Sequence, residues 1–307
     1  MTSAPQSIPQ SIPQSLTLPD GRRLEFLVGG ATDGVTLLHH SGTPSAAVVD
    51  PSLWDAAGRA GLRLVTYSRP GYGASTPRPT PDGWPVPLVA DAEDSATLLD
   101  HLGTDAFVTL GHSGGGPRAL ACAATMPDRC RAVASLAGVA PHGADGLDWD
   151  AGMGPENVRD FEAAVAGREA FRTIAVEQAE ELGAVTADDI VAAFGGLVDE
   201  VDASALTGEF AEVVAASFRH AMAQGPVGMV EDTLQIVRPW GFDVADLTVP
   251  VSVWQGAHDK MVPFAHGRWL AGAIPGARAH LFDDEGHISL VARYDEILAD
   301  LRELAGL

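Results

Sequence analysis

The stretch FVTLGHSGGG, residues 107–116, decides the fold expected of this chain. An apolar run, 107–110, leads into a G-x-S-x-G pattern centred on Ser113, and a helix of small residues follows through Ala124. A nucleophile on a sharp strand-to-helix turn needs small neighbours, because larger side chains would clash with the adjoining strand and helix. The pattern therefore predicts a strand, a tight turn that presents Ser113 as a nucleophile, and a helix.

Similar apolar runs recur along the chain and alternate with helical segments. Runs of Val, Leu and Ala of this length are typical of strands buried on both faces, which implies a mostly parallel sheet covered by helices. Before them, two alternating runs at 16–18 and 23–28 flank a Pro-Asp-Gly turn and predict a β-hairpin. The fold class is therefore α/β, with buried strands at 35–38, 62–67, 106–110, 132–137, 249–254 and 277–282.

Strand signals are absent between residues 142 and 240, and the pattern there is helical. We divide the chain into a core, 16–141 and 241–307, and an inserted helical cap, 142–240. Residues 1–15 carry a repeated Gln-Ser-Ile-Pro unit, whose prolines block helix and sheet, so we expect a disordered tail. A last helix, 289–304, should pack on the core. The cap helices are predicted at 155–166, 168–182, 186–194, 204–223 and 227–237.

A serine hydroxyl is a poor nucleophile at neutral pH, so it needs a histidine to take its proton and an acid to orient that histidine. His287 follows the last predicted strand, on a loop at the edge of the sheet where Ser113 also lies. Asp259 follows the strand 249–254 at the same edge. We therefore assign Ser113, Asp259 and His287 as the catalytic residues.

Other histidines and acids fit these roles less well. His112 adjoins the nucleophile and should point away from it, and His258 precedes the better acid. Asp145 would suit an architecture with the acid one strand earlier. The remaining candidates are expected in helices, in a strand or in a solvated turn: His101, His220, His266, His280, Asp283 and Asp284.

The tetrahedral intermediate of acyl transfer carries negative charge, which two backbone N–H groups would stabilise. Gly114 should supply one donor. The loop HHSGTP, residues 39–44, should supply the other, with Thr43 as first choice and Gly42 as second. His39 and His40 could instead bind a metal, but neighbouring residues on a strand point to opposite sides. We therefore expect no metal, and no organic cofactor, because the chain supplies every group needed.

Taken together, these motifs resemble those of the α/β-hydrolase fold superfamily, from about residue 16 to the C-terminus. SRPGYGAS, residues 68–75, is similar to the superfamily's D-x-R-G-x-G-x-S loop, and GAHD, residues 256–259, is similar to its G-x-x-D acid turn. The resemblance implies the triad Ser113, Asp259 and His287, with substrate bound between cap and core. Two positions depart from the pattern. SGTP at 41–44 stands where H-G-x-P is common, which leaves His40 one place early, and Ser68 stands where Asp is common.

The residue at the elbow separates several relatives within this superfamily. Epoxide hydrolases and haloalkane dehalogenases of this fold use Asp there, and proline iminopeptidases resemble H-G-G-P-G in the oxyanion loop, which this chain lacks. Our leading hypothesis is a serine hydrolase acting on an ester or lactone of an uncharged, moderately hydrophobic small molecule. A carbon–carbon bond hydrolase, an acyltransferase or cyclase with the same triad, and a non-catalytic ligand receptor stay open as alternatives.

The predicted cap supplies apolar side chains for a substrate pocket. We expect three or four of ten to face substrate, and the sequence shows no clustered cap carboxylates for an amino terminus and no Arg cluster for a phosphate. Our candidate substrate contacts are His40, His112, Trp149, Met153 and Met261. The ten apolar residues are Trp149, Met153, Phe161, Phe171, Phe194, Phe210, Phe218, Met222, Met229 and Trp240.

Composition excludes other classes of protein. The 307 residues are 46% hydrophobic and 20% charged, as in folded globular chains. Nineteen Lys and Arg against 41 Asp and Glu give a net charge of −22, which would repel nucleic acids and anionic membranes. Cys122 and Cys130 form no disulfide framework. No export signal or membrane span is evident, so we expect a cytoplasmic protein, monomer or homodimer, with a small-molecule substrate.

Overall fold

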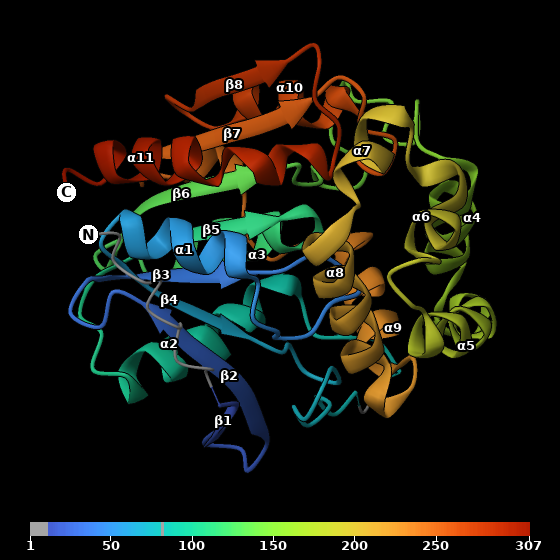
Figure 1. The fold of residues 1–307 in the computed structure, drawn as a ribbon, viewed down its shortest axis with the longest axis horizontal. Helices are drawn as coiled ribbons and strands as arrows, with labels where there is room; N and C mark the ends of the chain where they lie inside the picture. The colour runs from blue at the N-terminus through green and yellow to red at the C-terminus, as the bar shows by residue number, and fades with distance from the viewer. Residues whose placement is uncertain (1–11, 81–82) are drawn as a thin grey trace, which may run out of the picture.

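The computed structural model describes residues 12–80 and 83–307, and these build an eight-stranded sheet in the order β1-β2-β4-β3-β5-β6-β7-β8 (Figure 1). β1, β2 and β4 pair antiparallel, and every pairing from β4 to β8 is parallel. The sheet confirms the predicted α/β fold. The strands are β1 (Gln14–Thr17), β2 (Arg23–Gly30), β3 (Val35–His40), β4 (Leu62–Tyr67), β5 (Phe107–His112), β6 (Cys130–Leu136), β7 (Val251–Gly256) and β8 (Arg278–Phe282).

The central strands are buried on both faces, as their unbroken apolar sequences predict. Side chains alternate across a strand, so Leu37 and Leu38 enter hydrophobic clusters on opposite sides of the sheet, as do Leu64 and Val65. Helices α1 (Pro51–Arg59) and α11 (Tyr294–Leu304) cover one face. The other face packs against α2 (Asp91–His101), α3 (Gly116–Thr125) and α10 (Phe264–Ala273).

Between β6 and β7 the described chain forms helices and no strand, and we call α4 to α9 the cap helices. Figure 1 shows them gathered beyond the ends to which the strand arrows point. Because active-site loops follow the carboxyl ends of parallel strands, the cap helices lie over the edge where function is expected. They are α4 (Pro155–Ala166), α5 (Arg168–Ala184), α6 (Ile190–Phe194), α7 (Glu200–Ala205), α8 (Gly208–Ala221) and α9 (Val227–Ile236).

Three predicted helices differ from those observed. The helix expected over 204–223 is divided into α7 and α8 by Leu206 and Thr207, whose backbones are not helical, and Gly208 follows them with a φ of +54°. Asp199 begins α7 earlier than predicted, because its side chain accepts hydrogen bonds from the amides of Val201 and Asp202. The helix expected over 186–194 begins at Ile190, and the last helix begins as a 3₁₀ turn, Ser289–Arg293, before α11.

The amino-terminal tail expected over 1–15 differs where the structure describes it. Residues 1–11, which contain most of the repeat, lie outside the described residues. Gln14 and Ser15 are not disordered: they belong to β1, paired with Phe26 and Glu25 of β2. The hairpin strand therefore begins two residues before the predicted 16–18, because backbone pairing does not require apolar side chains at an edge.

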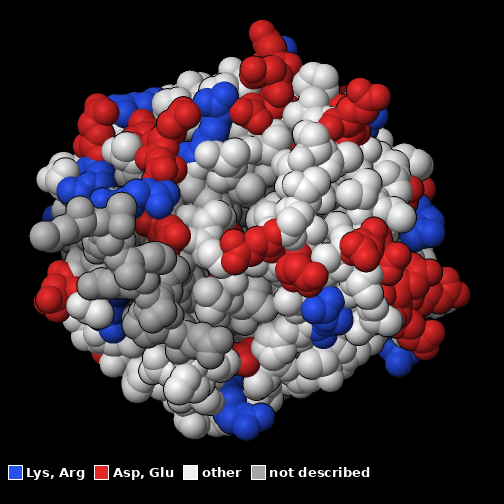
Figure 2. All heavy atoms as spheres, in the orientation of Figure 1, with Lys and Arg blue, Asp and Glu red and all other residues white. Residues whose placement is uncertain are grey.

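The surface carries the negative charge of the sequence in a dispersed form. Figure 2 shows acidic side chains spread over the visible face, with basic side chains between them. Within residues 12–80 and 83–307, none of the helices combines the length and apolar character that crossing a membrane requires.

Candidate active site

Ser113 lies at the sharp turn that the sequence predicts between β5 and α3. Its φ of +55° is strained for a residue with a side chain, and in the described chain Ala137 alone among other non-glycine residues shares a positive φ. Small neighbours are required here. A Cβ on Gly111 would lie 2.2 Å from the carbonyl oxygen of Gly115, and one on Gly115 would lie 2.0 Å from that of His40. The elbow therefore presents Ser113 at the carboxyl edge of the sheet.

His287 and Asp259 meet at the same edge, on the loops after β8 and β7. Nδ1 of His287 lies 2.8 Å from Oδ2 of Asp259, and both side chains are buried. The Asp259 carboxylate also accepts hydrogen bonds from the side chain of Gln255 and the amides of Met261 and Val262. Four partners thus fix the carboxylate. In the neutral imidazole the hydrogen bond to Asp259 places the single ring proton on Nδ1 and leaves Nε2 free to accept a proton.

The charges around His287 favour its protonated form. Burial lowers the pKa of its imidazole, but the carboxylates of Asp259 and Asp202 outweigh that effect, and the net shift is upward. His112 behaves differently. Its ring lies 4.9 Å from that of His287, and burial together with the nearby His287 lowers its pKa to about 3. His112 therefore stays neutral, with Nε2 3.1 Å from the backbone oxygen of His287.

Asp202, on cap helix α7, holds the loop that carries His287, and the sequence analysis missed it. One carboxylate oxygen accepts the amide of His287 at 2.9 Å, and the other accepts those of Ile288 and Ser289 at 2.8 and 2.9 Å. The side chain is fully buried. No sequence signal could have linked the two segments, because they are 85 residues apart and belong to different parts of the fold.

The expected oxyanion residues surround Ser113. A Cβ on Gly42 would lie 3.4 Å from Cβ and 3.8 Å from Oγ of Ser113, so this loop passes directly over the nucleophile. A Cβ on Gly114 would lie 2.4 Å from Oγ1 of Thr43, so the elbow and the loop are in close contact. Among the described residues, the amides of Gly42 and Thr43 have no backbone or side-chain acceptor. They are therefore available to a ligand.

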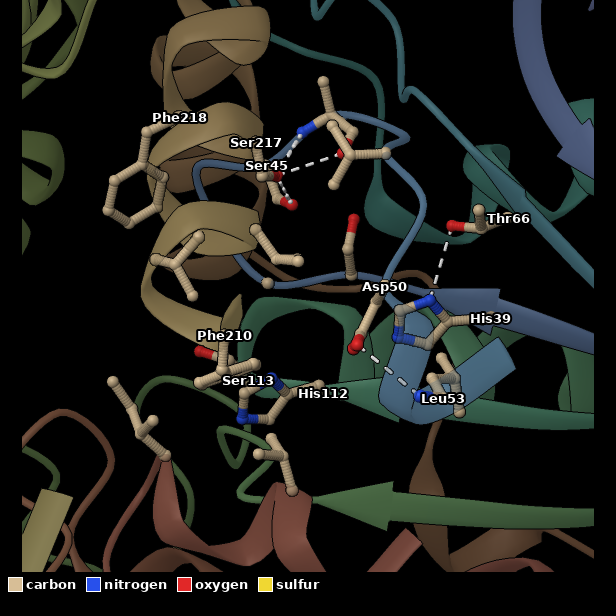
Figure 3. Close-up of a pocket in the computed structure, with 18 of the residues that line it drawn as sticks. His39, Ser45, Asp50, Leu53, Thr66, His112, Ser113, Phe210, Ser217 and Phe218 are labelled. Atoms are coloured by element: carbon tan, nitrogen blue, oxygen red, sulfur yellow. Dashed lines mark hydrogen bonds between the residues drawn. The ribbon is translucent and has the colours of Figure 1, made fainter. Parts of the chain in front are cut away.

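Two cavities meet at Ser113. The first, of about 160 Å³, also contains His287, Gly42 and Thr43, and its walls come from α1, α8 and the core (Figure 3). The second, of about 320 Å³, lies between the core and α4, α5 and α9, and shares Ser113 and Thr43 with the first. Cap helices contribute apolar side chains to both cavities, beside core residues in the first: Phe194, Phe210, Val213, Val214 and Phe218 in the first, and Phe161, Phe171, Phe194, Phe218 and Met229 in the second.

The second cavity corrects one expectation about the cap. Glu156, Asp160 and Glu181 all line it, although no clustered cap carboxylates were expected. Arg159 and Gln178 donate hydrogen bonds to Asp160, which compensates part of this charge. Glu156 and Asp160 lie about one turn apart on α4, and Glu181 of α5 joins them because α4 packs against α5.

The structure separates the five predicted substrate contacts. His112 lines the first cavity, and Met261 lines both. The prediction is wrong for the other three. His40 points into the core, where Nδ1 lies 3.0 Å from the hydroxyl of Tyr67. Trp149 donates to the carbonyl of Ala140 and packs on His266, and Met153 is buried in the core cluster, so these bulky side chains support the cap instead of facing the cavities.

The rival acids and histidines lie elsewhere. Asp283 and Asp284 are exposed, and His258 contacts Asp199 on the cap at 2.8 Å. His39 and His40 point to opposite sides of β3, as expected for neighbours on a strand: His39 lines the first cavity and His40 does not. No cluster of three or more potential metal ligands occurs in residues 12–80 and 83–307.

Comparison with known proteins agrees with this architecture. Residues 35–293 match the family model described as alpha/beta hydrolase fold. A pimeloyl-[acyl-carrier protein] methyl ester esterase of Aromatoleum aromaticum is 28% identical, over 80% of this chain and 90% of that protein. A bifunctional epoxide hydrolase 2 of Sus scrofa is 33% identical over 38% of this chain and 20% of its own length.

A solved structure shows the same fold. The enol-lactonase of Burkholderia xenovorans superposes with a TM-score of 0.68 at 21% identity, covering 96% of this chain and all of that one. The match to the family model spans the elbow, the acid turn and the loop of His287. The chain belongs to the alpha/beta hydrolase fold family.

Proposed function

We propose that this protein is a serine hydrolase that cleaves a carboxylic ester or lactone through an acyl-enzyme. The observation that carries the proposal is the buried 2.8 Å contact between His287 and Asp259, because His287 lines the cavity that also contains Ser113 on a strained elbow. Strain at a nucleophile persists only where the surrounding structure imposes it, and it occurs preferentially at functional sites.

In the first half of the proposed reaction, Oγ of Ser113 attacks the carbonyl carbon as its proton moves to Nε2 of His287. Asp259 stabilises the imidazolium that forms. The carbonyl electron pair moves onto oxygen, and the amides of Gly114 and Thr43, with Gly42 nearby, stabilise that oxyanion. Collapse of the intermediate breaks the bond to the leaving alkoxide, which takes the proton from His287 and departs as the alcohol.

In the second half, water repeats the sequence on the acyl-enzyme. His287 takes a proton from the water as its oxygen bonds to the acyl carbon, and the bond to Oγ of Ser113 then breaks. The proton returns from His287 to Ser113, and the acid is released. For a lactone, alcohol and acid are the two ends of one product.

The walls of the first cavity support an uncharged, moderately hydrophobic substrate group. Leu53, Trp54 and Val214 line it, and apolar surface of this kind favours a group that leaves water. The carboxylate of Asp50 also lines this cavity, where it accepts hydrogen bonds from the amides of Ser52 and Leu53 at the start of α1. His39 adds a polar atom without charge, because burial lowers its pKa to about 4. The methyl ester esterase of Aromatoleum aromaticum supports the assignment to an ester, since it covers most of this chain.

Serine at the elbow argues against an epoxide hydrolase, because that reaction in this fold uses an aspartate nucleophile and the matched relatives share only part of the chain.

The test of the proposed function is turnover of a series of p-nitrophenyl esters and lactones by the parent protein and by Ser113→Ala. We expect hydrolysis that Ser113→Ala abolishes while circular dichroism shows a folded protein. Hydrolysis that survives in Ser113→Ala, or none by the parent, would refute the proposal. Adding a competing alcohol or amine separates hydrolysis from acyl transfer.

A further inference from the structure

Arg69, in the SRPGYGAS loop after β4, has no role in the mechanism above, yet its guanidinium is 1% exposed beneath the oxyanion loop. It donates to the carbonyl oxygens of Ser41 and Gly42, each at 2.6 Å. These carbonyls belong to the two peptide units that carry the amides of Gly42 and Thr43. A trans peptide directs N–H and C=O to opposite sides, so a guanidinium that holds both carbonyls turns both amides away from itself.

A second buried arginine holds the other side of the site. Arg118, on α3, donates to the carbonyl oxygen of Gly114 at 2.5 Å and is fully buried. It therefore fixes the Gly114–Gly115 peptide, which directly follows the peptide that carries the expected Gly114 donor. Between them, Arg69 and Arg118 hold both segments from which oxyanion donors are expected, and neither arginine lines either cavity.

Asp232, on cap helix α9, joins the two arginines. One carboxylate oxygen accepts from Arg69 at 2.6 and 2.9 Å, and the other accepts from Arg118 at 2.8 Å. The first oxygen also accepts the hydroxyl of Thr43 at 2.9 Å. Burial would raise the pKa of Asp232, but the two arginines hold it below the ordinary value, so the carboxylate is ionised. We call these three residues the Arg69–Asp232–Arg118 clamp.

We propose that the Arg69–Asp232–Arg118 clamp positions the oxyanion donors, and that a cap residue, Asp232, is therefore part of the oxyanion site as well as of the substrate cover. The inference rests on the proposed function. Removing Asp232 would leave two buried guanidinium groups without their shared counter-ion, so this carboxylate couples the docking of α9 to the geometry of the site. Arg69 and Arg118 act through the backbone and touch no reacting atom.

The test compares two ketones of one chain length, a methyl ketone and its trifluoromethyl analogue. Oγ of Ser113 adds to the activated carbonyl carbon of the trifluoromethyl ketone, the hydroxyl proton passes to His287, and the carbonyl oxygen becomes an oxyanion. The methyl ketone binds without forming this adduct. The inhibition constant of the methyl ketone divided by that of the trifluoromethyl ketone therefore reports stabilisation of the oxyanion separately from binding in the cavity.

Arg69→Met should reduce this ratio at least 10-fold and lower kcat by a similar factor with little change in KM, because one misplaced donor costs about 10²–10³ in kcat at such sites. The acid side of the pH profile, which reports His287, should not move. The matched control is Arg22→Met. Arg22 is also buried and donates twice to a buried carboxylate, Asp94, but contacts no active-site loop, and its loss should leave the ratio unchanged.

Arg69→Lys is a second variant that tests the same proposal if Arg69→Met does not fold. It keeps the charge but not the planar fork that reaches two carbonyls, so the ratio should fall several-fold. A parent preference for the trifluoromethyl ketone that survives in the folded Arg69 variants would overturn the inference and leave the hydrolase intact. A parent protein that binds both ketones equally would overturn the proposed function and the inference together.

Discussion

The carboxylate of Asp202, on the cap, accepts a hydrogen bond from the backbone amide of His287, on the core, at 2.9 Å. Two more amides of the same loop bind the same carboxylate. The cap therefore contributes directly to the position of the proposed base. The negative charge of Asp202 also acts on the imidazole, since Asp202 is one of the groups that raise the pKa of His287.

Asp202→Asn should lower kcat and move the acid side of the pH–rate profile to lower pH. His287 acts as a base only when neutral, so activity falls as pH drops through its pKa. Removing the charge of Asp202 removes one cause that raises this pKa, and the amide cannot accept all three hydrogen bonds. We expect a loss of about 10-fold in kcat, as ordering of the loop weakens.

Glu177→Gln is the control for Asp202→Asn, because it removes the same charge from an exposed position on cap helix α5. It should leave both kcat and the profile of kcat/KM against pH unchanged. If the acid limb of Asp202→Asn coincides with that of the parent protein, Asp202 does not act on His287 as described.

Asp259→Asn should reduce kcat by about 10⁴ without unfolding the protein. The amide nitrogen would face Nδ1 and favour the wrong imidazole tautomer, which leaves no acceptor for the Ser113 proton. Steady-state kinetics on the best ester, with circular dichroism for folding, measures this loss. A variant that retains more than a tenth of the parent rate would show that another acid performs this role.

Gly114→Ala should separate the elbow from the oxyanion loop. A Cβ there would lie 2.4 Å from Oγ1 of Thr43, and Thr43 is held by Asp232, so the contact can be relieved only by moving the loop. We expect kcat to fall about 100-fold or more. Gly58→Ala, on α1, is the control because its Cβ would meet nothing within 4 Å. Equal activity of the two variants would contradict the proposed oxyanion geometry.

The pair of His220, on α8, and Glu25, on β2, should make stability depend on pH. Nε2 of His220 lies 2.9 Å from the Glu25 carboxylate. The bond to Glu25 raises the pKa of His220 against the effect of burial. Burial would raise the pKa of Glu25, but His220 and other donors outweigh it, and the net shift is downward. The contribution of Glu25 is lost as pH falls through its lowered pKa, and that of His220 as pH rises through its raised pKa.

His220→Gln should therefore lower Tm most between about pH 4.5 and 6.5, the ordinary values of the two groups, and less at pH 9. The loss should not exceed about 1 kcal/mol, because His220 is partly exposed. Thermal melts across this range measure it, with His101→Gln as the control. A difference in Tm that does not vary with pH would show that the pair is not ionised.

Local patterns predicted most of the fold and the core of the candidate site. The elbow at Ser113 is specified within ten residues, and the strands that lead to Asp259 and His287 are apolar enough to place both loops at one edge. The break before Gly208 was missed because a single glycine in an apolar helical pattern does not by itself end a helix.

Contacts between distant segments could not be predicted. Asp202 and Asp232 lie among many cap carboxylates, and nothing in their neighbourhood indicates that one binds the His287 loop and the other two buried arginines. The same limit explains why His40 and Trp149 were wrongly predicted to contact substrate. Their distance from substrate depends on which face of β3 and which side of the cap meets the cavities, and tertiary packing alone decides this.

The most direct test of the account is the mass of the intact protein after exposure to a fluorophosphonate probe. Oγ of Ser113 would bond to phosphorus, fluoride would leave, and His287 would take the hydroxyl proton. We predict a single adduct on Ser113 in the parent protein and none in Ser113→Ala or His287→Ala. No adduct on a folded parent protein, or an adduct that persists in Ser113→Ala, would contradict the assignment of Ser113 as an activated nucleophile.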